Sequence, residues 1–313
     1  MFARFLRLDC VCIAAGLRAA VLLLVLGVAP AASVLRAQTP QGGFEGGCPA
    51  FPLMVAGNGY FAILSPEGTE LRRWPGGNNN DAWLLPDGAL LAATGEAAEW
   101  DAQGTKRWGY ASEVKQGGGV FSCQRLPNGN TLIGENSTGQ IFELTPEGDK
   151  RAVIQVPLNQ GNRHQTLRMV RRYPDGTTLV CRSGANTVEL YDAQGTCFWR
   201  QQVPGLAFAA VRDGEGNVYV SSLAQIQKWS PEHQLLWEFK PAALGLPIAN
   251  MTGLHLLPNG NLVVGCYAYG PKQYGAFEVT PDKRLLWHYN SGRRYDSHMA
   301  VQLLDPAIAT PLR

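Results

Sequence analysis

Short apolar runs alternate with polar turn segments along almost the whole of this sequence. The runs are a few residues long and rich in β-branched and aromatic residues, as in Thr187–Tyr191 and Cys197–Trp199. Runs of this length, bounded by Gly, Pro, Asn, Asp and Ser, are typical of β-strands. The chain also contains 36 Gly and 20 Pro, which suits many tight turns. The pattern therefore predicts an all-β protein built from many short strands.

One turn phrase occurs six times, with Ser, Thr or Asp first, often Pro second, and Gly fourth in four of the copies. The copies are Ser65–Gly68, Asp101–Gly104, Thr145–Gly148, Asp192–Gly195, Ser230–His233 and Thr280–Lys283. The first side chain can accept hydrogen bonds from the following backbone, Pro presets φ, and Gly tolerates a positive φ. In four copies a Trp follows four residues later: Trp108, Trp199, Trp237 and Trp287. The phrase predicts the tip of a repeated β-hairpin.

A second hairpin phrase, built around Asn-Gly, Asp-Gly or Glu-Gly, alternates with the first. Its copies are Leu85–Gly88, Leu126–Gly129, Tyr173–Gly176, Asp213–Gly216 and Leu257–Gly260. Asn-Gly and Asp-Gly between apolar runs are strong hairpin signals. The two phrases together give four strands in each repeat of roughly 40–45 residues, which is the period of a β-propeller blade. The Trp residues would then lie on outermost strands and pack between neighbouring blades.

The two phrases also predict the number of blades and the way the ring closes. There are six copies of the first phrase and five of the second, and the missing strand belongs to the N-terminal repeat, which starts near Pro52. The segment Met299–Asp305 has the pattern of an innermost strand. We therefore predict a six-bladed β-propeller of four-stranded blades. Its C-terminal strand, about 298–305, would pair with the N-terminal strands, about 52–75, and remove the open sheet edges.

The N-terminal segment has the features of a secretory signal peptide. Arg4, Arg7 and Arg18 precede an apolar run at 19–29, and small residues follow it. We expect a signal peptide at 1–37, a flexible lead-in at 38–50, the propeller at 51–306 and a C-terminal tail at 307–313. The protein would be secreted or periplasmic, and it would contact a membrane only if the leader were kept as an anchor.

Charge and cysteine content exclude several classes of function. The expected leader holds four Arg and one Asp, which leaves 23 basic and 24 acidic residues of the 27 and 25 in the whole sequence. A nearly neutral body gives no reason to expect a nucleic-acid partner, and we expect a monomer. Five of the seven Cys follow the leader, without metal-type spacing. We predict no disulfide framework and no metal site.

Two groups of repeats resemble known propeller families. The segments Trp100–Trp108 and Tyr191–Trp199 resemble the quinoprotein-type (PQQ-like) β-propeller repeats, and the Leu-Pro-Asn-Gly-Asn hairpins at 126–130 and 257–261 resemble bacterial aryl-sulfotransferase propellers. The resemblance covers about residues 50–305. Quinoprotein dehydrogenases have eight blades, bound calcium and, in many members, adjacent cysteines. This chain has six predicted blades and no adjacent cysteines, so we expect neither PQQ nor calcium, and no other cofactor.

In a propeller the links between blades and the loops between second and third strands gather on one face. Divergent loops on a regular scaffold are common binding positions. We therefore expect a binding module that holds a small molecule, glycan or protein at the channel mouth. The candidate binding residues are Asp81, Asn162, Arg163, His164, Arg182, Tyr269, Arg294 and His298. The alternative implied by the second resemblance is sulfotransferase-like group transfer by the channel histidines His164 and His298, supported by Arg163 and Arg294.

Overall fold

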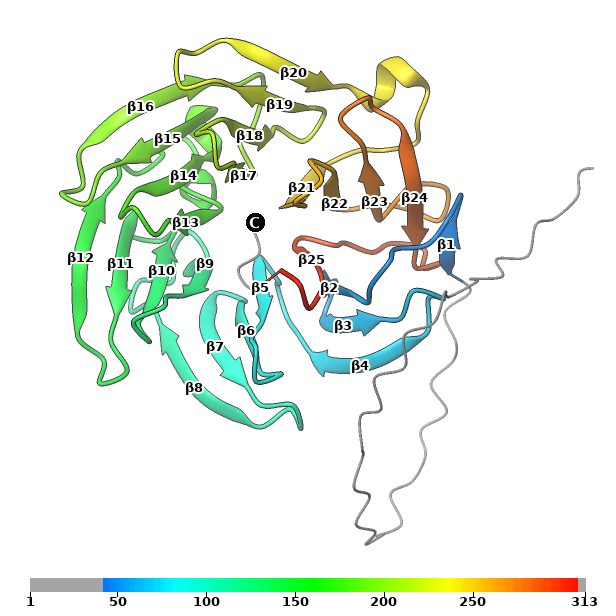
Figure 1. Cartoon of the computed structure of the whole chain (residues 1–313). Coiled ribbons are helices and arrows are strands. Elements are labelled where there is room, and N and C mark those ends of the chain that lie inside the picture. The colour runs from blue at the N-terminus through cyan, green and yellow to red at the C-terminus, as the bar shows by residue number, and fades with distance from the viewer. Residues whose placement is uncertain (1–41, 309–313) are drawn as a thin grey trace, which may run out of the picture. The chain divides into compact units, whose positions relative to one another are not determined.

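The computed structural model describes residues 42–308. These residues form six antiparallel sheets arranged as a ring (Figure 1). The predicted six-bladed β-propeller is therefore confirmed. The predicted signal peptide, the first part of the lead-in and the tail residues 309–313 lie outside the described residues.

Each blade contains four strands, which follow one another from the channel outward. The first three blades are β25 (Val301–Leu303), β2 (Leu53–Gly57), β3 (Tyr60–Leu64) and β4 (Glu70–Pro75); β5 (Asp81–Leu84), β6 (Leu90–Ala93), β7 (Glu96–Trp100) and β8 (Lys106–Ala111); and β9 (Val120–Arg125), β10 (Thr131–Glu135), β11 (Gln140–Leu144) and β12 (Lys150–Gln155). The others are β13 (Val170–Arg172), β14 (Thr178–Arg182), β15 (Thr187–Tyr191) and β16 (Cys197–Gln202); β17 (Ala209–Arg212), β18 (Val218–Ser221), β19 (Ile226–Trp229) and β20 (Leu235–Phe239); and β21 (Met251–Leu256), β22 (Leu262–Cys266), β23 (Ala276–Val279) and β24 (Leu285–Asn290). Three short 3₁₀ helices lie in the connections: η1 (Arg163–Gln165), η2 (Ser183–Ala185) and η3 (Pro241–Leu244).

The ring closes as the sequence predicts, because the last strand completes the first blade. β25 pairs with β2 in the register Leu53↔Leu303 and Val55↔Val301. The closing segment also lies tightly against the sixth blade. A Cβ added at Gly265 would lie 2.2 Å from the carbonyl oxygen of His298, so this position requires glycine. The closing strand thus joins the two ends of the propeller through both hydrogen bonding and packing.

Inner strands are buried on both faces, because each sheet packs between two others. All five residues of β2, β3, β10 and β22 are buried. The outermost strands bury far fewer residues. β4 buries only Trp74, and β16 buries only Trp199. The predicted Trp packing is therefore confirmed for these blades, whereas the third blade, with Ala152 at the Trp position, buries Ile154 instead.

Several Trp side chains also link one blade to the next by a hydrogen bond. The indole Nε1 of Trp74 donates to the carbonyl oxygen of Asp101 at 3.0 Å, that of Trp199 to Pro231 at 3.0 Å, and that of Trp237 to Pro281 at 2.7 Å. Each acceptor lies in the following blade, in the turn between its third and fourth strands, which is the phrase that begins with Ser, Thr or Asp. The repeat therefore specifies a hydrogen-bonded contact between blades as well as a hairpin.

The turn phrases have the backbone conformation that their residues predict. Gly68 and Gly104 have φ values of +86°. The two copies that lack Gly place His233 and Lys283 at φ values of 64° and 66°. The left-handed conformation is thus a property of the turn, and a side chain is accommodated there at some cost.

A short strand at the N-terminal end differs from what the sequence predicts. Residues 43–45 of the expected flexible lead-in form β1 (Gly43–Glu45), which pairs with β24 on the outer edge of the sixth blade (Figure 1). Phe44 of this strand contacts Trp287 edge-on, with ring centroids 5.3 Å apart. The hydrogen bonds offered by the edge of β24 and the apolar surface of Trp287 together explain why this segment is ordered.

Two Trp residues at equivalent repeat positions should contribute differently to stability. Trp199 is 6% exposed, and we expect Trp199→Ala to lower the free energy of unfolding by about 3 kcal/mol, through lost burial and the cavity left behind. Trp237 is half-buried, and its replacement by Ala should cost less than half as much. Urea denaturation of both variants measures the difference, and equal losses would contradict this account of the packing.

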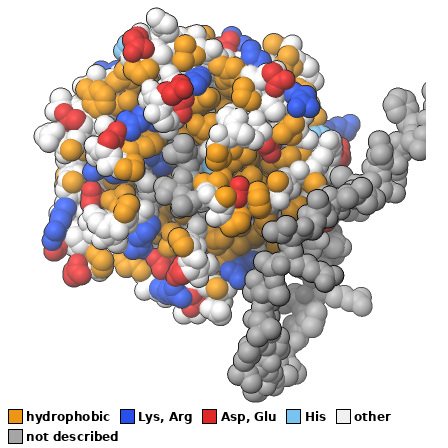
Figure 2. Space-filling model, in the orientation of Figure 1, with side chains coloured by type: hydrophobic (Ala, Val, Ile, Leu, Met, Phe, Trp, Pro, Cys, Tyr) orange, Lys and Arg blue, Asp and Glu red, His pale blue; other side chains and the backbone are white. Residues whose placement is uncertain are grey.

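The remaining surface is mixed in character. On the face shown in Figure 2, basic and acidic side chains are interspersed around the ring, with hydrophobic side chains between them. Within residues 42–308, no helix has the length and hydrophobicity that crossing a bilayer requires. Cys181, Cys197 and Cys266 carry free thiols.

Candidate functional site

A cavity of about 300 Å³ opens at the channel mouth, on the face that carries the links between blades. Its walls come from residues that directly precede innermost strands, such as Asn80, Phe208 and Asn250, together with nearby loops. The remaining lining residues are Gly57, Asn58, Gly77, Asn78, Asn79, His164, Arg168, Leu206, Leu223, Tyr267, Ser297 and Met299. Innermost strands enter the channel from this face, so residues just before them can line the mouth, as Asn80, Phe208 and Asn250 do.

Arg168 is the central cation of this cavity. Its guanidinium carbon lies 4.6 Å from the ring centroid of Phe121 and 4.7 Å from that of Phe208, an arrangement that allows cation–π attraction on both sides. Nη1 donates to Oδ1 of Asn80 at 3.0 Å, whereas the buried Nε has no hydrogen-bond partner. Burial lowers the pKa of Arg168 to about 10. The side chain therefore remains cationic at neutral pH.

Most other described lining residues with a functional group are neutral and polar, and none is acidic. Asn58, Asn80 and Asn250 contribute amide groups, and Ser297 and Tyr267 contribute hydroxyl groups. Amides and hydroxyls can both donate and accept hydrogen bonds. The mouth thus combines one partly buried positive charge, aromatic surface and several neutral hydrogen-bonding groups.

The link between β12 and β13 holds Arg168 and His164 in place. Asn136 donates from Nδ2 to the carbonyl oxygen of Arg163 at 2.9 Å and accepts from the Leu167 amide at 2.8 Å. From the other side, the predicted binding residue Arg182 donates to the carbonyl oxygens of Thr166 and Pro157. Asn136 and Arg182 are both buried. Arg182 therefore positions the mouth segment and does not face the cavity.

The other residues of this segment have separate roles. Asn162 caps η1 by accepting from the His164 amide at 3.1 Å, and Arg163 is half-buried. The His164 imidazole contacts Phe121 edge-on, with centroids 4.9 Å apart. Burial, followed by the nearby charge of Arg168, lowers the pKa of His164. Of the predicted binding residues, His164 is the one that lines the cavity.

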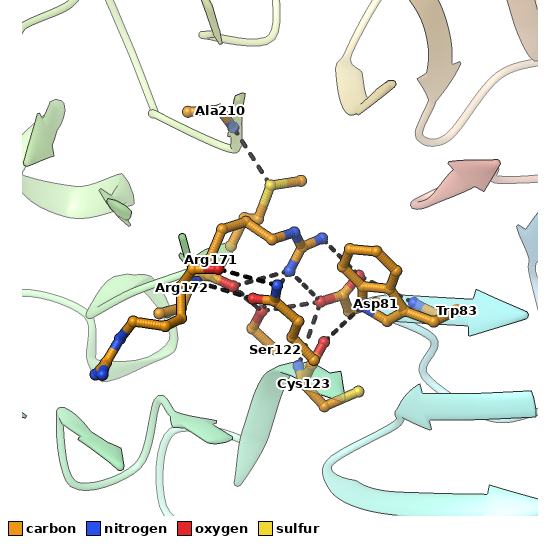
Figure 3. Close-up of polar contacts among 11 residues, drawn as sticks. Asp81, Trp83, Ser122, Cys123, Arg171, Arg172 and Ala210 are labelled. Carbon is orange, nitrogen blue, oxygen red and sulfur yellow. Dashed lines mark hydrogen bonds and ion pairs between the residues drawn. The ribbon is translucent and has the colours of Figure 1, made fainter. Parts of the chain in front are cut away.

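Below the mouth, Asp81 forms a buried ion pair that connects three blades (Figure 3). Its two carboxylate oxygens accept from the guanidinium of Arg171 at 2.7 and 2.9 Å. They also accept from the Ser122 hydroxyl at 2.8 Å and the Cys123 amide at 3.3 Å. Arg171 lies over the Trp83 ring at 4.8 Å. The carboxylate is thus engaged by β9 and β13, and its evident role is to hold innermost strands together.

His298 and Tyr269 lie in a second buried cluster, where the ring closes. The hydroxyls of Tyr60 and Tyr269 approach Nε2 of His298 at 3.4 and 3.2 Å, and Tyr60 also donates to Asp296 at 2.8 Å. His298 and Asp296 are 0% exposed. Burial lowers the pKa of His298 to about 4, so the imidazole is neutral at pH 7. The cluster joins the first and sixth blades to the closing segment.

The group-transfer arrangement suggested by the sequence is not assembled in the described part of the chain. His164 lies beside Phe121 of the third blade, whereas His298 lies among tyrosines of the first and sixth blades. Arg294 is exposed, and no hydrogen bond or ion pair of its side chain joins it to either histidine. The geometry therefore does not favour the sulfotransferase-like alternative.

Arg168, Phe121 and Phe208 were not among the predicted site residues. Their signal in the sequence is positional: Phe208 directly precedes an innermost strand, and Arg168 lies two residues before one. Comparison of these positions across the six repeats would have identified the single Arg. Within residues 42–308 no group of three or more His, Cys, Asp or Glu side chains is placed to bind a metal ion.

Comparison with known proteins supports the fold. No protein-family model matches the sequence, and no curated protein matches it. Among solved structures, a protein of unknown function from Bacteroides caccae has a TM-score of 0.67 and 16% identity, over 85% of this chain and 99% of that chain. Virginiamycin B lyase from Staphylococcus aureus, in a catalytically inactive form with quinupristin, has a TM-score of 0.55 and 12% identity over 81% and 86% of the two chains. The β-propeller domain of Myceliophteria thermophila Cps50 (Swd1) has a TM-score of 0.53 and 12% identity over 79% and 88%. These identities establish a shared β-propeller fold and no shared activity.

Proposed function

We propose that this protein is a binding module that holds a small molecule in the cavity at its channel mouth. The supporting observation is the cavity itself, which offers about 300 Å³ lined by Arg168, Phe208 and several amides. Ligand pockets typically start at about this volume and combine apolar walls with a few oriented polar groups. A small molecule or one glycan residue would fit a concave site of this size better than the flat surface of a protein partner would.

The other features of the proposal come from the sequence. The N-terminal segment supports secretion or a periplasmic location, and the turn phrases support a place among the PQQ-like repeat propellers. We propose a monomer that binds neither nucleic acid nor PQQ or calcium. The leader would connect the protein to a membrane only if it were retained.

Filling the cavity tests the proposal. Leu206→Trp should place an indole in the mouth, whereas Leu71→Trp adds the same group on β4 at a side chain that is 58% exposed. A library of acidic, neutral and basic small molecules is screened by thermal shift, because a ligand that binds only the folded state raises Tm. Ligands should stabilise the original protein and Leu71→Trp, and should fail to stabilise Leu206→Trp. Hits that persist in Leu206→Trp, or a screen without hits, would contradict binding at the mouth.

A further inference from the structure

We infer that the ligand of the mouth is a small hydroxylated carboxylate, such as a sugar acid, whose carboxylate group binds Arg168. The inference rests on the proposed binding function and specifies the chemistry of its ligand. It begins with the guanidinium, which has five N–H donors. One hydrogen bond, to Asn80, is made in the described part of the chain, and Nε is buried without a partner.

Arg171, a buried arginine of the same channel, shows how this chain satisfies a guanidinium with one of its own carboxylates. Arg171 lies over an aromatic ring, as Arg168 does, but it also donates to both carboxylate oxygens of Asp81, at 2.7 and 2.9 Å. Two parallel N–H···O bonds of this kind are the strongest and most specific pairing of Arg. Arg168 has the aromatic contacts, but no carboxylate of residues 42–308 pairs with it. An incoming carboxylate would supply the missing half of the same arrangement.

The charges around Arg168 favour a negatively charged ligand over a neutral or positively charged one. None of the described residues that line this cavity is Asp or Glu, and the other basic side chain there, His164, becomes cationic when protonated. Asp81 lines a smaller neighbouring pocket together with Arg168, but its carboxylate is paired with Arg171. An unpaired buried charge is costly, and a ligand carboxylate would remove that cost. The cation–π contacts with Phe121 and Phe208 fix the plane of the guanidinium, so its donors point in a constant direction.

The uncharged polar residues of the lining indicate which groups the ligand carries besides its carboxylate. Amides of Asn58, Asn80 and Asn250 and the hydroxyl of Ser297 surround the cavity. Groups that both donate and accept hydrogen bonds match hydroxyl groups, which do the same. Asn80 and Ser297 already accept hydrogen bonds from Arg168 and from the Ala268 amide. A purely apolar acid would therefore leave mainly the amides of Asn58 and Asn250 without partners, at a cost in affinity. The combination therefore points to a carboxylate that carries several hydroxyls.

The inference is tested by calorimetric titration with matched probes. The acids are glucuronate, galacturonate, gluconate and glycerate, and the controls are neutral glucose and galactose and the inorganic anions sulfate and phosphate. At least one acid should bind, and should bind at least tenfold more tightly than its neutral partner and than either inorganic anion. Equal binding of acid and neutral sugar, tighter binding of sulfate or phosphate, or no binding by any acid would overturn the inference.

Substitutions of Arg168 test whether this residue binds the carboxylate of the ligand. Arg168→Gln should weaken the acid at least tenfold, and Arg168→Lys should retain part of the affinity because it keeps the charge without the planar fork. Arg284→Gln, which removes an exposed arginine from a turn on the opposite face, should bind as the original protein does. Unchanged affinity in Arg168→Gln would refute the assignment.

Two measurements separate ligand binding from a structural role of Arg168. Because Arg168 has no carboxylate partner in the described residues, Arg168→Gln should melt at the same temperature as the original protein or higher. In the original protein, the bound acid should raise the NMR-measured pKa of His164, because a nearby negative charge favours the imidazolium. Arg168→Gln should not show this rise. If only neutral molecules bind, and Leu206→Trp blocks them, the proposed function stands and this inference falls.

Discussion

Removal of residues 298–313 is expected to unfold the whole ring. This truncation deletes β25, whose hydrogen bonds with β2 complete the first blade. It also deletes contacts to both neighbouring blades, since the Leu303 amide donates to His255 Nδ1 at 3.0 Å and the Leu84 amide donates to Gln302 at 3.0 Å. The edge of β2 and the apolar faces beside it would become exposed together. A closed ring has no partly closed form that keeps these groups buried.

Urea denaturation followed by tryptophan fluorescence and far-UV circular dichroism measures this effect. We expect the truncated chain to lose the cooperative transition. The control ends after Ile308, which keeps every described strand, and it should unfold at nearly the same urea concentration as the full chain. A cooperative transition in the shorter variant, with a midpoint close to that of the control, would show that closure by β25 is dispensable.

Asp81→Ala should produce the largest loss of stability of any single substitution considered, about 5 kcal/mol. The side chains of Asp81 and Arg171 are both 3% exposed, so the substitution leaves a guanidinium in the channel without its carboxylate. The Ser122 hydroxyl and the Cys123 amide lose the same acceptor. Removing one partner of a buried pair costs far more than the pair itself contributes, because the remaining charge is not solvated.

A surface pair and a double variant provide the controls for Asp81. The Asp175–Arg212 pair has a similar composition, but the Asp175 side chain is 51% exposed, so Asp175→Ala should cost less than about 1 kcal/mol. Adding Arg171→Met to Asp81→Ala should recover more than half of the loss, since it removes the charge that Asp81 no longer neutralises. Equal losses for Asp81→Ala and Asp175→Ala in urea denaturation would contradict the role assigned to the buried pair.

The fold could be predicted from this sequence because its determinants are local and repeated. Each turn phrase fixes a hairpin through its own residues, as the positive φ of Gly68 and of His233 illustrates. Six copies then determine the number of blades, and the unmatched strand at 299–305 predicts closure. β1 could not be predicted in this way, because it occurs once and depends on a distant edge, that of β24, and on Trp287.

The candidate site was less predictable because polarity does not reveal burial. Three predicted site residues are polar and lie at the expected level of the ring, but their side chains bond to other parts of the protein. Asp81 pairs with Arg171, Arg182 donates to the Thr166 carbonyl oxygen, and His298 contacts the Tyr269 hydroxyl. Whether a charge has an internal partner depends on neighbouring blades, about 40 or more residues away. Arg168 is the converse case, since its neighbours are Phe121 and Phe208. Only the arrangement of three blades shows that no carboxylate of the described residues pairs with it.

The positions just before the innermost strands have a consequence for how this scaffold can diversify. Arg168, Phe208 and Asn250 lie outside the strand ladders, so their identities are not constrained by sheet pairing. Corresponding positions in the other blades can therefore be altered independently while the hydrogen-bonded framework stays intact. Under the proposed function, a residue type present in only one blade, such as Arg168, would break the pseudo-sixfold symmetry and give the ligand one preferred orientation. The ligand selectivity of the mouth could then be changed by substitutions in one blade at a time.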